Sequence, residues 1–174
     1  IKILSILIMT KTKLFSVFIA LFSLVLIPCA VADIMINETT TTLTANSSDN
    51  IGVGTTSLGS LTSGTNNVAI GDNSSNSTTT GSHNIALGDN SGGGIVTGQE
   101  NIAIGDNTLS SSNAGSGNIA IGSSTLSNAT GNDNIVIGRD SGSSIPSGQG
   151  NIIIGNDTGF SLSNDNYKLI IDSH

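Results

Sequence analysis

The feature that most constrains this chain is a five-residue unit, Asn-apolar-small-apolar-Gly, which occurs seven times between residues 50 and 155. The copies read NIGVG, NVAIG, NIALG, NIAIG, NIAIG, NIVIG and NIIIG, and they follow one another every 17 residues, with one interval of 16. In six of the seven copies a second glycine stands three residues before the asparagine. A spacing this regular predicts that the chain repeats one structural unit along its length.

Each repeat is expected to supply one short strand. Its apolar positions are rich in β-branched residues, and the flanking Gly, Ser, Thr and Asn favour turns. A 17-residue period is too short for a helix, a strand and their connections, but it suffices for one coil of a β-solenoid. We therefore predict an all-β fold, a single-chain parallel β-solenoid of about seven coils of 16–17 residues over residues 50–158. Equivalent residues of successive coils would lie about 4.8 Å apart.

Two positions of the repeat are predicted to form structural ladders along the stack. Stacked asparagines can bond to one another through their side-chain amides, and glycine permits the left-handed backbone that a tight corner needs. The asparagine ladder comprises Asn50, Asn67, Asn84, Asn101, Asn118, Asn134 and Asn151, and the glycine ladder comprises Gly54, Gly71, Gly88, Gly105, Gly122, Gly138 and Gly155.

Side chains alternate between the two faces of a strand, which separates the three apolar residues of each repeat into two sets. We expect the outer pair, such as Ile102 and Ile104, to point into the coil. The middle residues would then form an outward row: Gly52, Ala69, Ala86, Ala103, Ala120, Val136 and Ile153. Because strands that are apolar on both faces are usually buried on both, this row predicts a homo-oligomer face that widens toward the larger Val136 and Ile153.

The second arm of each coil carries isolated apolar residues that are predicted to fill the core from the opposite side. They are Leu58, Leu61, Ile95, Leu109, Leu126, Ile145, Phe160 and Leu162. Residues 33–49 are interpreted as an extended N-terminal cap. Residues 159–174, with a final strand at 169–171, are interpreted as a C-terminal capping strand or the start of a truncated neck.

The N-terminal residues predict export. Residues 9–32 have the layout of a signal peptide: Lys11 and Lys13, an uncharged apolar run from Leu14 to Ile27, and a small-x-small site ending at Ala32. Residues 1–8 are interpreted as upstream read-through, although an uncleaved anchor is the alternative. Cleavage would leave a chain without cysteine, with 2 basic and 12 acidic residues and a formal charge of 2 − 12 = −10. That charge excludes the basic footprint of a nucleic-acid-binding protein.

No catalytic residue or cofactor site is expected. His83 lies in a predicted turn and His174 stands at the last position, without partners at metal or triad spacing. Gly115-x-Gly117-x-x-Ala120 matches a dinucleotide fingerprint by letter, but it precedes a strand and opens no helix.

A hexapeptide acyltransferase is the strongest enzymatic alternative, because its coils are of similar length. That fold needs an apolar residue every six positions, whereas Asn76 and Ser82 stand six and twelve residues after Ile70. The sequence therefore favours a non-enzymatic protein.

Asp72, Asp89 and Asp106 follow the ladder glycine in three consecutive repeats and would stack. They are weak candidates for a calcium site; a solvated acidic edge is the favoured interpretation, so no metal site is assigned.

Ice binding is a further alternative, since ranked threonines on a flat face can order water. Thr108, Thr125 and Thr158 share one position of the repeat, but they form no paired T-x-T rows.

The G-x-x-N-[IV]-A-[IL]-G units, followed by Asp or Asn and then Ser or Thr, resemble the head repeats of YadA-type trimeric autotransporter adhesins. The resemblance covers Asn50 to about Thr158. It implies a left-handed parallel β-roll, a homotrimer and display on a bacterial outer membrane, where such heads attach to surfaces and serve virulence. The chain departs from the family in its longer period and in the lack of a neck motif or heptad stalk up to His174. It is therefore interpreted as a piece of a longer adhesin or as a free-standing secreted roll.

The expected function is that of a surface-exposed, non-enzymatic adhesin head that attaches a bacterial cell to host or environmental surfaces. Its expected partners are copies of itself and an extracellular-matrix or surface ligand, with no nucleic acid and no cofactor. The alternative function is that of a secreted structural solenoid, such as an ice-binding or fibre protein.

Overall fold

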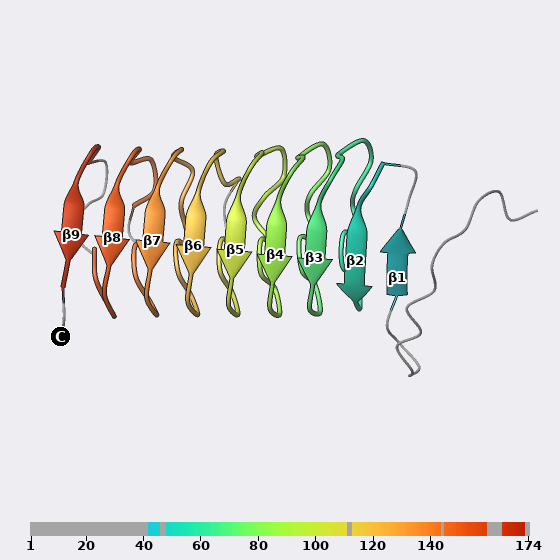
Figure 1. Ribbon diagram of the computed structural model, residues 1–174, viewed down its shortest axis with the longest axis horizontal. Coiled ribbons are helices and arrows are strands. Elements are labelled where there is room, and N and C mark those ends of the chain that lie inside the picture. Colours follow the sequence, from blue (N-terminus) through green and yellow to red (C-terminus); the bar gives the residue numbers. More distant parts are fainter. Residues whose placement is uncertain (1–41, 46–47, 111–112, 144, 160–164, 173–174) are drawn as a thin grey trace, which may run out of the picture. The chain divides into compact units, whose positions relative to one another are not determined.

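Each repeat folds into one coil, and the coils stack so that their strands form a single sheet (Figure 1). The computed structural model describes residues 42–45, 48–110, 113–143, 145–159 and 165–172. These residues all belong to one unit, Ile36–His174. The predictions for residues 1–8, for the signal peptide at 9–32, and for Phe160 and Leu162 lie outside the described residues.

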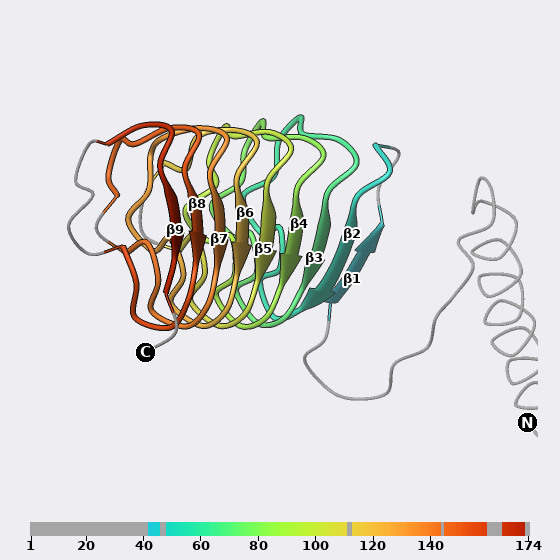
Figure 2. The same ribbon diagram turned by 60° about the vertical axis from the view of Figure 1, so that its left-hand side comes forward.

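All regular elements of the described residues are strands. They are β1 (Thr42–Ala45), β2 (Ile51–Gly54), β3 (Val68–Ile70), β4 (Ile85–Leu87), β5 (Ile102–Ile104), β6 (Ile119–Ile121), β7 (Ile135–Ile137), β8 (Ile152–Ile154) and β9 (Leu169–Ile171). The sheet order is the chain order, and every pair from β2 to β9 is parallel. The predicted β-solenoid is thus confirmed, and Figure 2 shows the second arms closing the coils behind the sheet.

The register of the sheet places equivalent repeat positions on top of one another. Ile102 of β5 is paired with Ile119 of β6, and Ala103 with Ala120. The 16-residue interval leaves this register intact, because Ile119 is paired with Ile135 in the next coil. The missing residue is therefore absorbed in the second arm and not in the sheet.

The two ends of the sheet differ in direction. β1 runs antiparallel to β2, with Leu43 opposite Val53. It lies within the segment interpreted as an N-terminal cap. β9 coincides with the predicted final strand and continues the parallel stack on β8.

The glycine ladder occupies the corner directly after each strand. Gly105 has a φ of 128°, a value that side-chain-bearing residues rarely adopt. A Cβ atom built on it would lie 2.6 Å from the carbonyl oxygen of Gly122 in the next coil. Glycine is therefore required here both by the backbone conformation and by the close approach of the stacked coils.

The middle residue of each strand points into the coil, so the predicted orientation of the strand was wrong. Six of the seven residues expected on an outward oligomer face are fully buried: Ala69, Ala86, Ala103, Ala120, Val136 and Ile153. Gly52 is buried as well. These residues form the core and cannot contact another chain.

The asparagine ladder explains the orientation. Asn118 immediately precedes β6 and is fully buried. Because side chains alternate along an extended segment, a buried Asn118 directs Ile119 outward, Ala120 inward and Ile121 outward. The same alternation holds in every coil, since each ladder asparagine from Asn50 to Asn151 is buried.

The increase in size toward Val136 and Ile153 compensates for small residues on the second arm. A Cβ atom at Gly142 would lie 3.2 Å from Cγ1 of Val136, and one at Gly159 would lie 3.0 Å from Cδ1 of Ile153. In the coil before these two, the smaller Ala120 is accompanied by Leu126, which is also fully buried. In these two coils the larger middle side chain thus reaches the space next to the second-arm glycine, and because Val136 and Ile153 are fully buried, the size change does not widen an assembly.

The second arm fills the core as predicted. Leu58, Ile95, Leu109, Leu126 and Ile145 are buried, and Leu61 packs against them at partial exposure.

Candidate functional site

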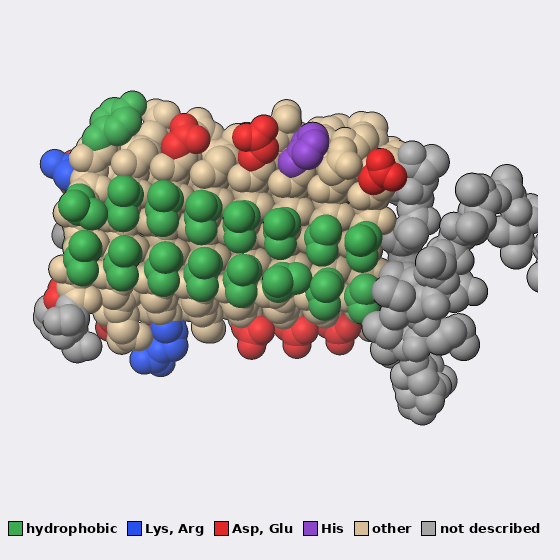
Figure 3. All heavy atoms as spheres, in the orientation of Figure 1, with side chains coloured by type: hydrophobic (Ala, Val, Ile, Leu, Met, Phe, Trp, Pro, Cys, Tyr) green, Lys and Arg blue, Asp and Glu red, His purple; other side chains and the backbone are tan. Residues whose placement is uncertain are grey.

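The outer pairs of the strands form an exposed aliphatic face (Figure 3), where two rows of hydrophobic side chains run along the stack. We call this surface the aliphatic face. It comprises Ile51, Val53, Val68, Ile70, Ile85, Leu87, Ile102, Ile104, Ile119, Ile121, Ile135, Ile137, Ile152, Ile154, Leu169 and Ile171. Ile70 is 44% exposed and Ile85 is 38% exposed, and the other members are exposed or half-buried. These pairs had been predicted to lie inside the coil, so the aliphatic face was missed from the sequence.

The size of the aliphatic face follows from the sheet geometry. Eight parallel strands, β2 to β9, contribute to it, which gives a length of about 38 Å at about 4.8 Å per strand. Three residues of strand give a width of about 10 Å. This face, on the order of 400 Å², is as large as the largest apolar patch on a typical monomer, a patch that is often functional, and it contains no polar side chain.

The asparagine ladder holds the strands of this face at a fixed level. Oδ1 of Asn101 accepts hydrogen bonds from the backbone N–H of Asn118 at 3.0 Å and from its Nδ2 at 3.2 Å. Nδ2 of Asn118 also donates to the carbonyl oxygen of Gly131 at 2.9 Å. Corresponding bonds run from Asn50 to Asn151. The predicted ladder is confirmed, and it fixes the start of each strand relative to its neighbours.

The margin that follows the strands is acidic in its first half. We call it the trailing margin; it contains Asp72, Asp89, Asp106, Ser123, Arg139 and Asn156, each directly after a ladder glycine. Oδ1 of Asp72 accepts a hydrogen bond from the backbone N–H of Thr55 at 2.8 Å, and Oδ1 of Asp89 accepts one from the N–H of Asp72 at 3.1 Å. All three carboxylates are exposed, and backbone donors of the preceding coil orient them.

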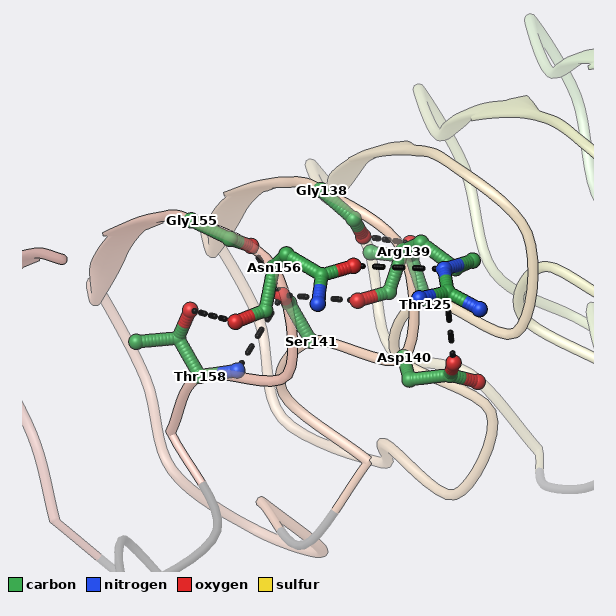
Figure 4. Close-up of polar contacts among 8 residues, drawn as sticks. All are labelled: Thr125, Gly138, Arg139, Asp140, Ser141, Gly155, Asn156 and Thr158. Atoms are coloured by element: carbon green, nitrogen blue, oxygen red, sulfur yellow. Dashed lines mark hydrogen bonds and ion pairs between the residues drawn. The ribbon is translucent and has the colours of Figure 1, made fainter. Parts of the chain in front are cut away.

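Arg139 is the basic residue of the trailing margin (Figure 4). Its Nε donates to Oδ1 of Asn156 at 3.2 Å and lies 3.8 Å from Oδ2 of Asp140. The side chain is 67% exposed. Both contacts are made through Nε, so the two terminal amino groups of the guanidinium lie outside them.

The margin that precedes the strands carries a second set of charges. We call it the leading margin; it contains Asp49, Asn66, His83, Glu100, Gly117, Asp133, Gly150 and Tyr167, each two residues before the first residue of a strand. All eight have a left-handed backbone, with φ between 56° and 72°, which turns the side chains away from the core. Asp49, His83, Glu100 and Asp133 are exposed. In Figure 3 acidic side chains accordingly lie along both edges of the aliphatic face.

The threonine position that suggested ice binding lies inside the coil. Thr108 and Thr125 are fully buried, and Thr158 is 6% exposed. Oγ1 of Thr125 donates to the carbonyl oxygen of Gly138 at 2.5 Å, and Oγ of Ser141 donates in the same way to Gly155 (Figure 4). These hydroxyls cap the glycine corner and do not face water, which removes the basis of the ice-binding hypothesis.

Metal and membrane features can be assessed only within the described ranges. There, no three His, Cys, Asp or Glu side chains are grouped so that they could hold a metal ion; Asp72, Asp89 and Asp106 are thus not assembled into a site. His83 contacts Nδ2 of Asn66 through Nε2 at 3.4 Å. Within the same ranges, no helix has the length and apolar character needed to cross a bilayer.

Comparisons with family models, with curated proteins and with solved structures give no match to this chain. The function is therefore argued from the aliphatic face, its two margins and the repeat.

Proposed function

We propose that this chain is the head of a surface adhesin: a non-enzymatic rod that assembles with copies of itself through the aliphatic face and meets its ligand with its polar sides. The observation that carries the proposal is the aliphatic face, to which each of eight strands contributes two aliphatic side chains. Apolar patches that are contiguous in this way are often functional, and the two unbroken aliphatic rows support an interaction site here.

A second copy of the chain is the partner that fits this face. Its rows of side chains repeat at one interval, about 4.8 Å, which an identical face matches along its whole length. The face offers no charged side chain with which a different protein could pair. Mature residues 33–174 carry a formal charge of −10, which disfavours an anionic lipid surface as the occupant.

The remaining features of the proposal rest on the resemblance of the NIAIG-type repeats to adhesin heads. We propose a homotrimer that is exported and displayed at a bacterial cell surface or outer membrane. The sides of the coil away from the aliphatic face present exposed Thr80, Thr97, Asn128 and Thr130. Binding to an extracellular-matrix or environmental surface would be distributed over many such weak polar contacts.

Assembly is tested by sedimentation velocity on the exported chain. We expect particles of three chains. Ile85→Lys places a charge within the aliphatic face, on the third of its eight strands, and is expected to yield monomers. Thr80→Lys adds the same charge to an exposed position of the preceding coil and should leave the assembly intact. A wild-type chain that is monomeric at micromolar concentration would refute the proposal.

Adhesion is tested with beads that carry the wild-type chain or the Ile85→Lys variant at equal density. The probe is a mixed extracellular-matrix preparation immobilised on a plate. We expect the wild-type beads to be retained and the monomeric variant to be retained less, because an assembly multiplies weak contacts. Assembly without retention on matrix or on host cells would reject the adhesin and leave a structural fibre protein.

A further inference from the structure

The charges of the two margins can be compared strand by strand, because each strand from β3 to β8 has one residue in the leading margin and one in the trailing margin. β7 lies between Asp133 and Arg139, β4 between His83 and Asp89, and β5 between Glu100 and Asp106. The leading margin has three carboxylates and one histidine. The trailing margin has three carboxylates and Arg139, its one cation among the described residues.

The symmetry of an assembly decides which margins meet. When copies are related by rotation about an axis parallel to the stack, as in any ring, the leading margin of one copy faces the trailing margin of the next. When two copies run in opposite directions, each margin faces its own counterpart. Copies displayed by one cell surface point the same end outward, so the proposed function requires the first arrangement.

We propose that an ion pair between Arg139 of one copy and Asp133 of the next sets the register of the parallel assembly that the proposed function requires. The inference rests on the proposed self-association through the aliphatic face. In register, the two ends of β7 bring Arg139 and Asp133 to the same level. A shift by one coil would place Arg139 opposite Gly117 or Gly150 instead.

The geometry at Arg139 suits this role. Its contacts with Asn156 and Asp140 hold Nε on its own chain, while the terminal amino groups remain for a carboxylate beyond the margin. Asp133 is exposed, and its Oδ1 lies over Gly117 of the preceding coil, next to the place that a Cβ atom on that glycine would take. A guanidinium and a carboxylate form a directional pair, which distinguishes registers that the uniform aliphatic rows alone would not.

The same arrangement brings together two further pairs of side chains from neighbouring copies, one favourable and one unfavourable. At β4, His83 faces Asp89 of the next copy, where an imidazole N–H can donate a hydrogen bond to the carboxylate. At β5, Glu100 faces Asp106, and two carboxylates at one level repel each other. Removing that repulsion is therefore expected to tighten the assembly.

The test is a charge-exchange series on the full exported chain, followed by sedimentation velocity over a dilution series at low salt. Arg139→Glu is expected to raise the concentration at which the assembly half-dissociates by at least tenfold. The double variant Arg139→Glu/Asp133→Arg should return it to within about threefold of wild type. Glu100→Lys should lower it several-fold, and all shifts should shrink in 1 M salt.

The matched control is Asp157→Arg. Asp157 is exposed and has a φ of 60°, as Asp133 has a φ of 57°, but it lies outside both margins. It should change the half-dissociation concentration by less than threefold. Circular dichroism and melting temperature confirm that each variant is folded.

The outcomes separate the two proposals. A chain that never assembles refutes the proposed function and this inference together. A chain that assembles, but in which Asp133→Arg does not rescue Arg139→Glu, refutes only the ion pair. Rescue by Asp89→Arg in place of Asp133→Arg would show an antiparallel pair, in which trailing margins meet, and would overturn the parallel arrangement.

Discussion

Replacing Asn118 with alanine tests the energetic role of the asparagine ladder. The amide of Asn118 is fully buried and makes four side-chain hydrogen bonds. Nδ2 donates to Oδ1 of Asn101 and to the carbonyl oxygen of Gly131, while Oδ1 accepts from the backbone N–H and from Nδ2 of Asn134 at 3.1 Å each.

The magnitude follows from the groups that the substitution leaves behind. Oδ1 of Asn101 still accepts from the backbone N–H of residue 118, and Nδ2 of Asn134 still donates to Gly148. The carbonyl oxygen of Gly131 and the backbone N–H of Asn134 lose the hydrogen bonds that the amide provided. Each buried, unpaired backbone group costs about 1–3 kcal/mol, so Asn118→Ala is expected to lower the free energy of unfolding by about 4 kcal/mol.

The assay is guanidinium denaturation followed by circular dichroism, at one protein concentration because assembly also adds stability. Asn113→Ala is the matched control, since Asn113 is exposed in the same coil and should change stability by at most about 0.5 kcal/mol. Asn118→Asp keeps the size and the two acceptor bonds but turns both donor contacts into oxygen–oxygen contacts. A loss below about 1 kcal/mol for Asn118→Ala, or a stable Asn118→Asp, would contradict an energetic role for the ladder.

Two further predictions concern backbone space and buried hydroxyls, and both are checked by thermal melting. Gly52→Ala should stabilise the fold by about 0.5–1 kcal/mol, because the new Cβ meets no atom closer than 3.4 Å and reproduces the alanine of the following coils. Gly122→Ala should destabilise it by at least about 2 kcal/mol, since its φ is 130° and the Cβ would lie 2.6 Å from the carbonyl oxygen of Gly138; similar melting temperatures for the two variants would contradict the steric argument. Ser75→Ala should raise stability by about 1 kcal/mol, because its buried Oγ has no hydrogen-bond partner among the described residues. Ser74→Ala should lower stability by about as much, since its Oγ donates to the carbonyl oxygen of Ala86 at 3.2 Å; equal effects of the two serine substitutions would exclude this explanation.

The period of the repeat was sufficient to predict the solenoid and its strands, because the strands β2 to β8 occupy the seven apolar triplets. The ladders at Asn118 and Gly105 were also predictable, since stacking places identical residues in contact. Which triplet positions face outward was predicted wrongly, because large aliphatic residues such as Ile102 were assumed to fill the core. The signal that decides the matter is Asn101: a stacked amide ladder belongs inside, and alternation then directs Ile102 outward.

Other features depend on contacts that a one-dimensional pattern does not contain. The interior is narrow, and the second arm already fills much of it with Leu109 and Leu126, so that mostly small residues fit opposite them. In one coil the small Ala120 is accompanied by the large Leu126, and in the next the larger Val136 is accompanied by Gly142. This exchange of size can be recognised only when the two arms are seen to face each other. Likewise, the relation between Asp133 and Arg139 is not a spacing motif, and it acquires meaning only once the two margins are known to flank one face.

The asparagine ladder has a consequence for how such a chain can change in length. Its bonds connect equivalent positions of neighbouring coils, so removal of residues 85–101, one 17-residue period, would let Asn118 bond to Asn84 as it now bonds to Asn101. Each remaining coil would keep its cross-section, its outward pair and its margin residues, and the rod would shorten by about 4.8 Å. In-frame recombination between repeats can therefore adjust how far the rod reaches in steps of one strand spacing, without a new interior having to evolve at each length.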